Sequence, residues 1–338
     1  MKRYMMLALA VALALLLIPA AIAARVRDTL PENTTAAREA HPAADGAGET
    51  AESKPAEKDT VAVFMSDEGR VQTLPLREYL ISAVAGEMPA AYETEALKAQ
   101  ALASLTLVRY LQARGVRDET LCGAQVSTDA KRHQAYMRVE EMKTRWGERF
   151  EEYYEKLQAA VDAVLPYVIT FEGEPIMAAF HAVSTGVTET AETVWGKAVP
   201  YLVNCESAGD KLSPGFSSEA AFSPEELKEK LALPETQDPP ADWLGEASYS
   251  EAGTLLQITI CGKPFTGFEL REALGLRSAA VKPEFSGESF VFHVTGYGHG
   301  VGLSQYGADY YARQGMDYGE ILRHYYPGTE IVFDTAEG

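Results

Sequence analysis

The sequence predicts a mixed α+β fold, and three observations support this prediction. Short β-prone runs and helical patterns alternate along the chain, but without the regular strand–helix–strand rhythm of a doubly wound sheet. The 338 residues, 46% of them hydrophobic, are enough for a sizeable core. No internal repeat is present. We therefore expect helices and short antiparallel strands around a substrate cleft in residues 59–335, preceded by one N-terminal transmembrane helix.

The N-terminal 58 residues differ in composition from the rest of the chain. Lys2 and Arg3 precede an uncharged run about as long as the ~20 residues that a membrane-spanning helix needs. The small residues of AAIAA would also suit cleavage of a secretory signal. We interpret residues 1–24 as a membrane anchor or uncleaved signal that places the remaining chain outside the cytoplasm, and the sequence leaves cleavage open. Residues 25–58, rich in Ala, Glu, Pro and Gly, form a predicted flexible linker.

Within the domain, local patterns predict each element. Two β-prone runs around residues 67–69 predict a hairpin, and a second hairpin turns at residues 172–175. Apolar residues at helical spacing predict helices at residues 76–87 and 92–114, and a polar, heavily charged helical pattern predicts a third at residues 140–165. A polar surface excursion with one short helix is expected at about 207–245. The strand patterns TLLQITICG and SFVFHVT follow, and a glycine-rich loop with two helices ends the domain.

Charge and cysteine content exclude several classes of protein. A net charge of -19 argues against a nucleic-acid-binding surface, and an anionic polymer could be a substrate only in a locally basic cleft. Cys122, Cys205 and Cys261 show no C-x-x-C spacing, which argues against a zinc ribbon and a dense disulfide framework. One pair could form a disulfide, and the sequence does not say which.

Glu87 is the residue whose position most needs an explanation. It shares one helical stripe with apolar residues that include Leu80 and Val84, and Gly86 and Pro89 place it in the last helical turn. Burial and the negative end of the helix dipole would both raise the pKa of this carboxyl, as a general acid requires. The alternative is a glutamate at a frayed helix end, turned to solvent or paired with Lys98 or Arg109.

Four ordered blocks of the sequence resemble the stage II sporulation protein D family, which also includes amidase-enhancer proteins. They are AVAGEMPAAYETEALKAQALASLTLVRYL, AFHAVSTGVTETAETVWGKAVPYL, FTGFELREALGLRS and GYGHGVGLSQYGADYYARQGMDYGEILRHYYPG. The resemblance covers nearly all of residues 60–333. It implies a membrane-anchored lytic transglycosylase that cuts peptidoglycan between N-acetylmuramic acid and N-acetylglucosamine, with Glu87 as the catalytic acid.

The resemblance also implies a setting and a mechanism. Members of that family act in septal peptidoglycan remodelling and engulfment, beside a membrane-bound amidase and another membrane protein. Their substrate is glycan that has been stripped of its stem peptides. Protonated Glu87 would donate to the glycosidic oxygen and then take the proton of the muramic acid 6-hydroxyl, giving a 1,6-anhydro sugar. No cofactor is needed.

Further residues are predicted to bind the glycan. Ser184 is not surrounded by G-x-S-x-G, which argues against a serine hydrolase, and the loop GYGHGVGLSQYG lacks a dinucleotide fingerprint. The predicted substrate-binding residues are Lys98, Gln100, Arg109, His181, Ser184, Thr185, Tyr201, His299 and Gln305. For each of them an ordinary structural role is the alternative. The tyrosines near the C-terminal end could stack on sugar rings or belong to the core.

The sequence departs from the family at two places. Some clostridial members resemble a zinc site at C-x-D-x-x-H-C-Q-A-Y, but Ser127 and His133 stand here where those cysteines would be, and Cys122 is several residues away. We therefore predict that no zinc is bound. Many members also carry arginine at the position of Leu105.

Two other functions stay open. A non-catalytic glycan-binding or amidase-enhancing module would not need an acid on an apolar stripe. A muramidase that uses water would need a second acid, and Glu93 and Glu95 are the nearest in sequence to Glu87.

Overall fold

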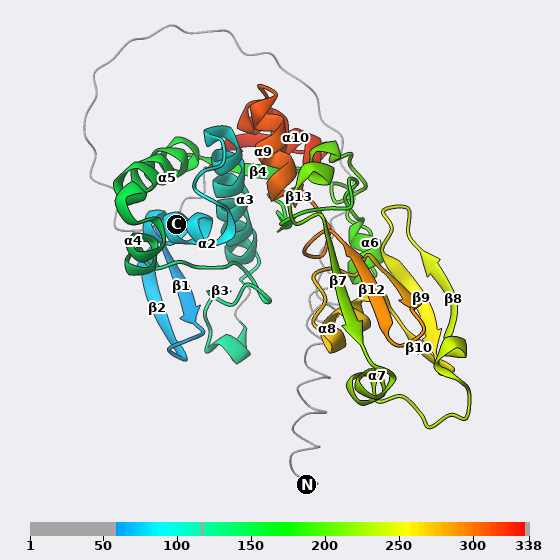
Figure 1. Ribbon diagram of the computed structural model, residues 1–338. Coiled ribbons are helices and arrows are strands. Elements are labelled where there is room, and N and C mark those ends of the chain that lie inside the picture. The colour runs from blue at the N-terminus through cyan, green and yellow to red at the C-terminus, as the bar shows by residue number, and fades with distance from the viewer. Residues whose placement is uncertain (1–58, 116–117, 335–338) are drawn as a thin grey trace, which may run out of the picture. The chain divides into compact units, whose positions relative to one another are not determined.

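The computed structural model describes residues 59–115 and 118–334, and it gives the mixed α+β fold that the sequence predicts (Figure 1). Helices and small sheets follow one another in no regular order, and one set of elements surrounds each of two hydrophobic cores. In these ranges no helix combines the length and apolar character needed to cross a bilayer. The predicted anchor and linker, residues 1–24 and 25–58, lie outside the described residues.

The larger core forms around a helix that is apolar on nearly every side. Helix α3 (Thr94–Ala113) buries most of its residues, among them Leu97, Leu102 and Leu105, which are fully inaccessible. A helix without a polar face is stable only when neighbours cover it on all sides. Those neighbours are α2 (Leu76–Glu87), α5 (Phe150–Val164), α9 (Gln305–Arg313) and α10 (Tyr318–Tyr325).

Both predicted hairpins are confirmed. Strands β1 (Thr60–Met65) and β2 (Arg70–Pro75) pair antiparallel, and β3 (Val126–Ser127) joins the open edge of β1 in parallel. The second hairpin joins β4 (Tyr167–Phe171) to β5 (Glu174–Pro175), with β14 (Glu330–Phe333) on the other edge of β4. Glu172 and Gly173 connect the two strands with positive φ angles of 53° and 83°, as a tight two-residue turn requires.

The third predicted helix is wrong as a single element. The helical pattern of residues 140–165 divides into α4 (Val139–Trp146), a 3₁₀ turn at Gly147–Arg149, and α5. Gly147 has a φ of 54°, a left-handed value that ends an α-helix and that glycine adopts at little cost. Charge periodicity does not distinguish one helix from two that share a similar pattern, so the break was not predicted.

The smaller core lies between two three-stranded sheets and two helices (Figure 1). One sheet has the order β11 (Val281–Phe285), β12 (Phe290–Thr295) and β7 (Ser217–Phe222). The other has the order β10 (Lys263–Phe265), β9 (Leu255–Ile260) and β8 (Leu244–Tyr249). The helices are α7 (Pro224–Leu231) and α8 (Gly267–Leu274). Strand β7 was missed, because SSEAAF carries little β-branched or aromatic signal.

A short parallel pair places the glycine-rich loop beside the rest of the site. Strand β6 (Phe180–His181) pairs with β13 (Leu303–Ser304), and α9 begins immediately after β13. Helix α6 (Ala191–Trp195) follows the loop after β6. Of the C-terminal tyrosines, Tyr325 and Tyr326 are fully buried, so the core interpretation is confirmed for these two.

The burial of α3 gives a stability prediction. Leu102→Ala removes a fully buried side chain from the larger core, and we expect it to lower the free energy of unfolding by about 2–5 kcal/mol. Leu256→Ala on β9 is the matched control, because its side chain is 41% exposed. Urea unfolding of both variants measures the difference. Equal losses would contradict the packing of α3 described above.

Candidate active site

Glu87 is held by two residues from distant parts of the chain. The backbone N–H of Ala135 donates to its Oε1 at 2.5 Å, and the side-chain amide of Gln305 donates to its Oε2 at 3.1 Å. Lys98 and Arg109 bond to other carboxylates. Glu87 therefore points inward, and the alternative in which it pairs with Lys98 or Arg109 is wrong.

A chain of amides continues from Glu87 into the helical core. The Gln305 amide also lies 3.3 Å from Gln100 Oε1, and the amide of Gln100 donates to Ser104 Oγ at 3.2 Å. Gln100, Ser104 and Gln305 are all buried. Two predicted substrate-binding residues, Gln100 and Gln305, are thus brought together with Glu87. The amide carries no net charge, and its hydrogen bond lowers the pKa of Glu87 by less than burial raises it.

The surroundings of Glu87 favour its protonated form. Burial raises the pKa of Glu87 above its ordinary 4.5, against the lowering effect of the hydrogen bonds from Ala135 and Gln305. The hydroxyl of Tyr79 is buried without a hydrogen-bond partner in the described residues. Burial raises the pKa of Tyr79, and the nearby carboxyl of Glu87 raises it further. No cation contributes to the pKa of Glu87. The pKa is raised, as expected from the sequence.

The loop that covers Glu87 is fitted closely to helix α2. A Cβ placed on Gly86 would lie 2.8 Å from the backbone nitrogen of Tyr136, so only glycine allows this approach. The N–H of Met137 donates to the carbonyl of Ser82 at 2.9 Å. These contacts fix the position of the Ala135 N–H that Glu87 accepts.

An ion pair anchors the beginning of the same loop. Arg132 Nη2 donates to Asp118 Oδ2 at 2.7 Å and lies 2.6 Å from Thr120 Oγ1. Burial acts to raise the pKa of Asp118, but hydrogen bonds from Thr120 and the charge of Arg132 outweigh it, and the pKa lies below its ordinary value. Arg132 therefore holds the loop to the preceding turn before it reaches Glu87.

The residues at the possible zinc position do not suit zinc. Ser127 Oγ accepts the N–H of Asp129 at 3.1 Å, and His133 is surrounded by Arg132, Asp118 and Asp129. Structural zinc needs four ligands, mostly thiolate and imidazole. In residues 59–115 and 118–334 no three His, Cys, Asp or Glu side chains are grouped so that they could hold a metal ion. The three cysteines are free in this structure.

Asp210 organises the other side of the site, and no sequence pattern pointed to this residue. It is fully buried, and its Oδ2 accepts both the N–H and the hydroxyl of Ser184, at 2.8 and 2.5 Å. Its Oδ1 accepts the hydroxyl of Ser304 at 2.8 Å. Burial raises the pKa of Asp210 against these bonds. Asp210 thereby ties predicted Ser184 to the residue that precedes Gln305.

The two predicted histidines form a neutral pair. Their ring centroids lie 5.9 Å apart, and the ring of Trp195 lies 5.5 Å from that of His299. Burial lowers the pKa of His181 to about 4. The pKa of His299 is lowered to about 3, mainly by burial and also by His181 and Arg271. Neither imidazole is charged at neutral pH. Nε2 of His181 is buried and has no partner in the described part of the chain.

The four other predicted substrate-binding residues form their bonds with residues other than Glu87, Gln100 and Gln305. Lys98 pairs with Glu95 at 2.7 Å, and Arg109 pairs with Asp334 at 2.6 Å. The hydroxyl of Tyr201 accepts the N–H of Met177, and Thr185 donates to the carbonyl of Ala252. Their proposed contact with substrate stays a prediction.

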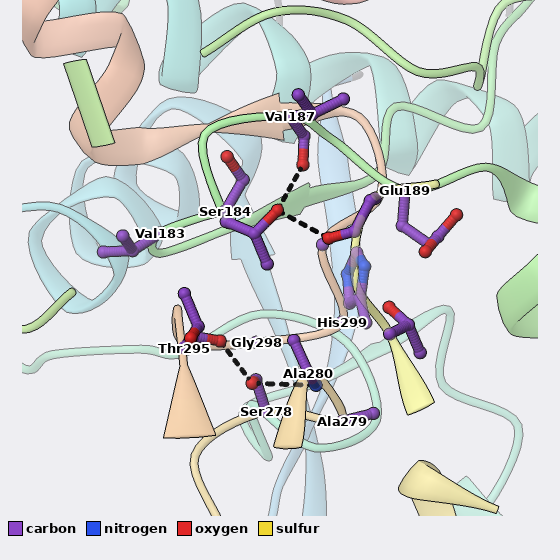
Figure 2. A pocket seen from close by; sticks show the side chains of 14 residues that line it. Val183, Ser184, Val187, Glu189, Ser278, Ala279, Ala280, Thr295, Gly298 and His299 are labelled. Atoms are coloured by element: carbon purple, nitrogen blue, oxygen red, sulfur yellow. Dashed lines mark hydrogen bonds between the residues drawn. The ribbon is translucent and has the colours of Figure 1, made fainter. Parts of the chain in front are cut away.

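Two hollows lie near these residues. One is enclosed, has a volume of about 20 Å³, and is lined by Ser184 and Glu189 on one wall and Ser278 and Thr295 opposite (Figure 2). That is room for one water molecule, not for a sugar ring. The other measures about 640 Å³, opens to solvent, and is lined by Gly86, residues 135–137 and the first two turns of α4. Only the second has the size of a ligand site.

Comparisons with known proteins identify the family of this chain. A family model described as a stage II sporulation protein matches residues 65–171, which include Glu87, α3 and the loop over Glu87. Stage II sporulation protein D of Bacillus amyloliquefaciens is 36% identical over 295 residues, covering 86% of this chain and 85% of that protein. The same protein of Bacillus subtilis is 36% identical over 291 residues, covering 86% of this chain and 82% of its own length.

The chain therefore belongs to the stage II sporulation protein D family, a family of sporulation proteins. The amidase enhancer of Bacillus subtilis is a more distant relative. It is 25% identical over 307 residues, and the match covers 74% of this chain but 39% of the enhancer.

The buried acid gives a pH-dependent stability prediction. Because the folded state raises the pKa of Glu87, ionisation costs stability once the pH rises through the folded pKa, and this cost is absent below about 4.5. We expect Glu87→Gln to be more stable than the wild-type protein at pH 8, with the difference shrinking toward pH 4. Urea unfolding at both values measures it, with Glu155→Gln on the exposed face of α5 as control. A difference that does not change with pH would show that Glu87 is solvated.

The anchoring of the loop gives a second prediction. Arg132→Ala removes a half-exposed ion pair worth about 1 kcal/mol or less, so we expect roughly fivefold faster hydrogen exchange at the Ala135 amide. Lys131→Ala, which alters an exposed neighbour, should leave that rate unchanged. Unchanged exchange in Arg132→Ala would mean that the loop is held by its contacts with α2 alone.

Proposed function

We propose that this protein is a membrane-anchored lytic transglycosylase that cuts the bond between N-acetylmuramic acid and N-acetylglucosamine in peptide-stripped glycan and leaves 1,6-anhydro ends. The observation that carries the proposal is the partly buried carboxyl of Glu87, whose pKa is raised and whose partners are an amide and a backbone N–H. A single acid of this kind can both donate and recover a proton near neutral pH.

The chemistry follows from one carboxyl acting twice. Protonated Glu87 would donate to the glycosidic oxygen as the bond breaks and an oxocarbenium-like state develops. The resulting carboxylate would take the proton of the muramic acid 6-hydroxyl while that oxygen bonds to the anomeric carbon. Atoms and charges balance without water. The N–H groups of Ala135 and Gln305 would stabilise the carboxylate between the two steps.

A water-using muramidase is less well supported. Such an enzyme needs a second carboxyl to activate water. Of the two acids nearest in sequence, Glu95 accepts from Lys98 and from the N–H of Tyr318. The other, Glu93, is tied through its backbone N–H to Asp309 on α9.

Product analysis tests the proposed activity. The protein is incubated with peptide-stripped glycan strands, and the fragments are analysed by mass spectrometry. We expect anhydro-muramic ends with the wild-type protein and with Glu155→Gln, and a rate about 10²- to 10⁴-fold lower with Glu87→Gln. Ordinary reducing ends would show hydrolysis instead.

The second candidate function is a non-catalytic glycan-binding or amidase-enhancing module, favoured by the distant similarity to the amidase enhancer. If Glu87→Gln keeps its biological effect and its glycan binding, and the wild-type protein releases no product, this function is the better one.

The setting is part of the same proposal. Residues 1–24 would hold the protein in the membrane of the sporulation septum on the mother-cell side, with the catalytic domain outside the cytoplasm. A membrane-bound amidase that strips the peptides, and another membrane protein of the engulfment machinery, would be its partners.

A further inference from the structure

The guanidinium of one arginine lies over an exposed aromatic ring, and a second arginine is close enough to interact with the same residue through its charge. The guanidinium of Arg277 lies 4.6 Å from the ring centroid of Tyr297, whose side chain is 47% exposed. Arg271, on α8, lies near the same tyrosine: burial lowers the pKa of Arg271, and Tyr297 acts in the opposite direction. The group faces solvent at the start of the glycine-rich loop.

The absence of a carboxylate partner distinguishes these arginines. The chain has 49 acidic and 30 basic residues, so a basic side chain easily finds a partner. The half-buried arginines that pair with carboxylates are Arg77, Arg109, Arg132 and Arg138. Arg271 and Arg277 are half-buried as well, yet within residues 59–115 and 118–334 neither forms an ion pair. Half-burying a guanidinium without an anion costs free energy, which a bound anion would offset.

The backbone holds this group in place without the help of a ligand. The N–H of Tyr297 donates to the carbonyl of Val183 at 2.7 Å, and the N–H of Val183 donates to the carbonyl of Tyr297 at 3.1 Å. The N–H of Gly298 donates to the carbonyl of Arg277 at 3.0 Å. A Cβ on Gly215 would lie 2.7 Å from Arg277 Nη2, so glycine leaves the space that the guanidinium occupies. A preformed group loses less entropy when it binds a ligand.

The group is connected to the candidate acid by a short series of bonded residues. Val183 precedes Ser184, which bonds to Asp210. Asp210 accepts from Ser304, and the next residue, Gln305, donates to Glu87. A glycan strand has an N-acetylmuramic acid in every second position, so one sugar at Glu87 implies further muramic acids along the strand.

We propose that Arg271 and Arg277 bind the lactyl carboxylate of an N-acetylmuramic acid while its ring stacks on Tyr297. This inference rests on the proposed function for its substrate. In intact peptidoglycan that carboxyl is an amide with the stem peptide and carries no charge. Removal of the peptide exposes an anion that a guanidinium recognises by two parallel hydrogen bonds. The site therefore selects stripped strands by charge.

The test compares two ligands in a protein that does not cleave them. Glu87→Gln serves as the background, and binding is measured by isothermal titration with peptide-stripped strands and with the same strands after reduction of the carboxyl to an alcohol. We expect Arg277→Ala to weaken binding of the carboxylate strands about tenfold or more. Binding of the reduced strands should change by less than about twofold. Lys282→Ala, an exposed cation on β11, is the matched control for net charge.

The outcomes separate this inference from the proposed activity. Equal loss on both ligands, or no loss on either, would overturn the carboxylate site, and Arg271→Ala repeats the comparison if Arg277→Ala is poorly folded by circular dichroism. Carboxylate-dependent binding in a protein whose wild-type form releases no anhydro product would keep the site and reject the transglycosylase. Anhydro product formed equally fast from reduced strands would keep the transglycosylase and reject the carboxylate site.

Discussion

The hydrogen bonds of the Gln305 side chain bring the separate parts of the site together. One amide nitrogen reaches both Glu87 at the end of α2 and Gln100 within α3, and it is carried by the first residue of α9. Without these bonds nothing polar would connect the C-terminal third of the chain to the acid. The amide is neutral, and its hydrogen bond positions the carboxyl while lowering the pKa of Glu87 by less than burial raises it.

The distribution of cations explains why the acid can stay protonated. The two cations that the sequence offered as partners of Glu87 are bonded elsewhere, Lys98 to Glu95 and Arg109 to Asp334, and no cation contributes to the pKa of Glu87. The helix between them presents leucine at position 105, fully buried, where many family members carry arginine.

The sequence predicted what depends on local periodicity, and it missed what depends on chain crossings. Helices α2 and α3 and both hairpins follow from apolar spacing and turn residues, whereas the same spacing left the inward direction of Glu87 as one of two alternatives. Gln100 and Gln305 came from the resemblance. Asp210 and the Ala135 N–H could not be found, because a lone aspartate in a polar stretch and a backbone amide carry no sequence signal until tertiary structure buries them. Trp195 was missed for the same reason.

Ser304 gives the start of α9 an unusual function. Its hydroxyl oxygen accepts the N–H of Gly307, which caps the helix, while its proton goes to Asp210. The same hydroxyl therefore fixes both where the helix begins and where it is attached. A shift of α9 by one residue would place a tyrosine instead of Gln305 at Glu87. It would also leave the buried carboxylate of Asp210 without the hydroxyl donor that Ser304 provides. The helix register is thus locked at the residue next to the acid, so the precision of the site comes from a capping serine.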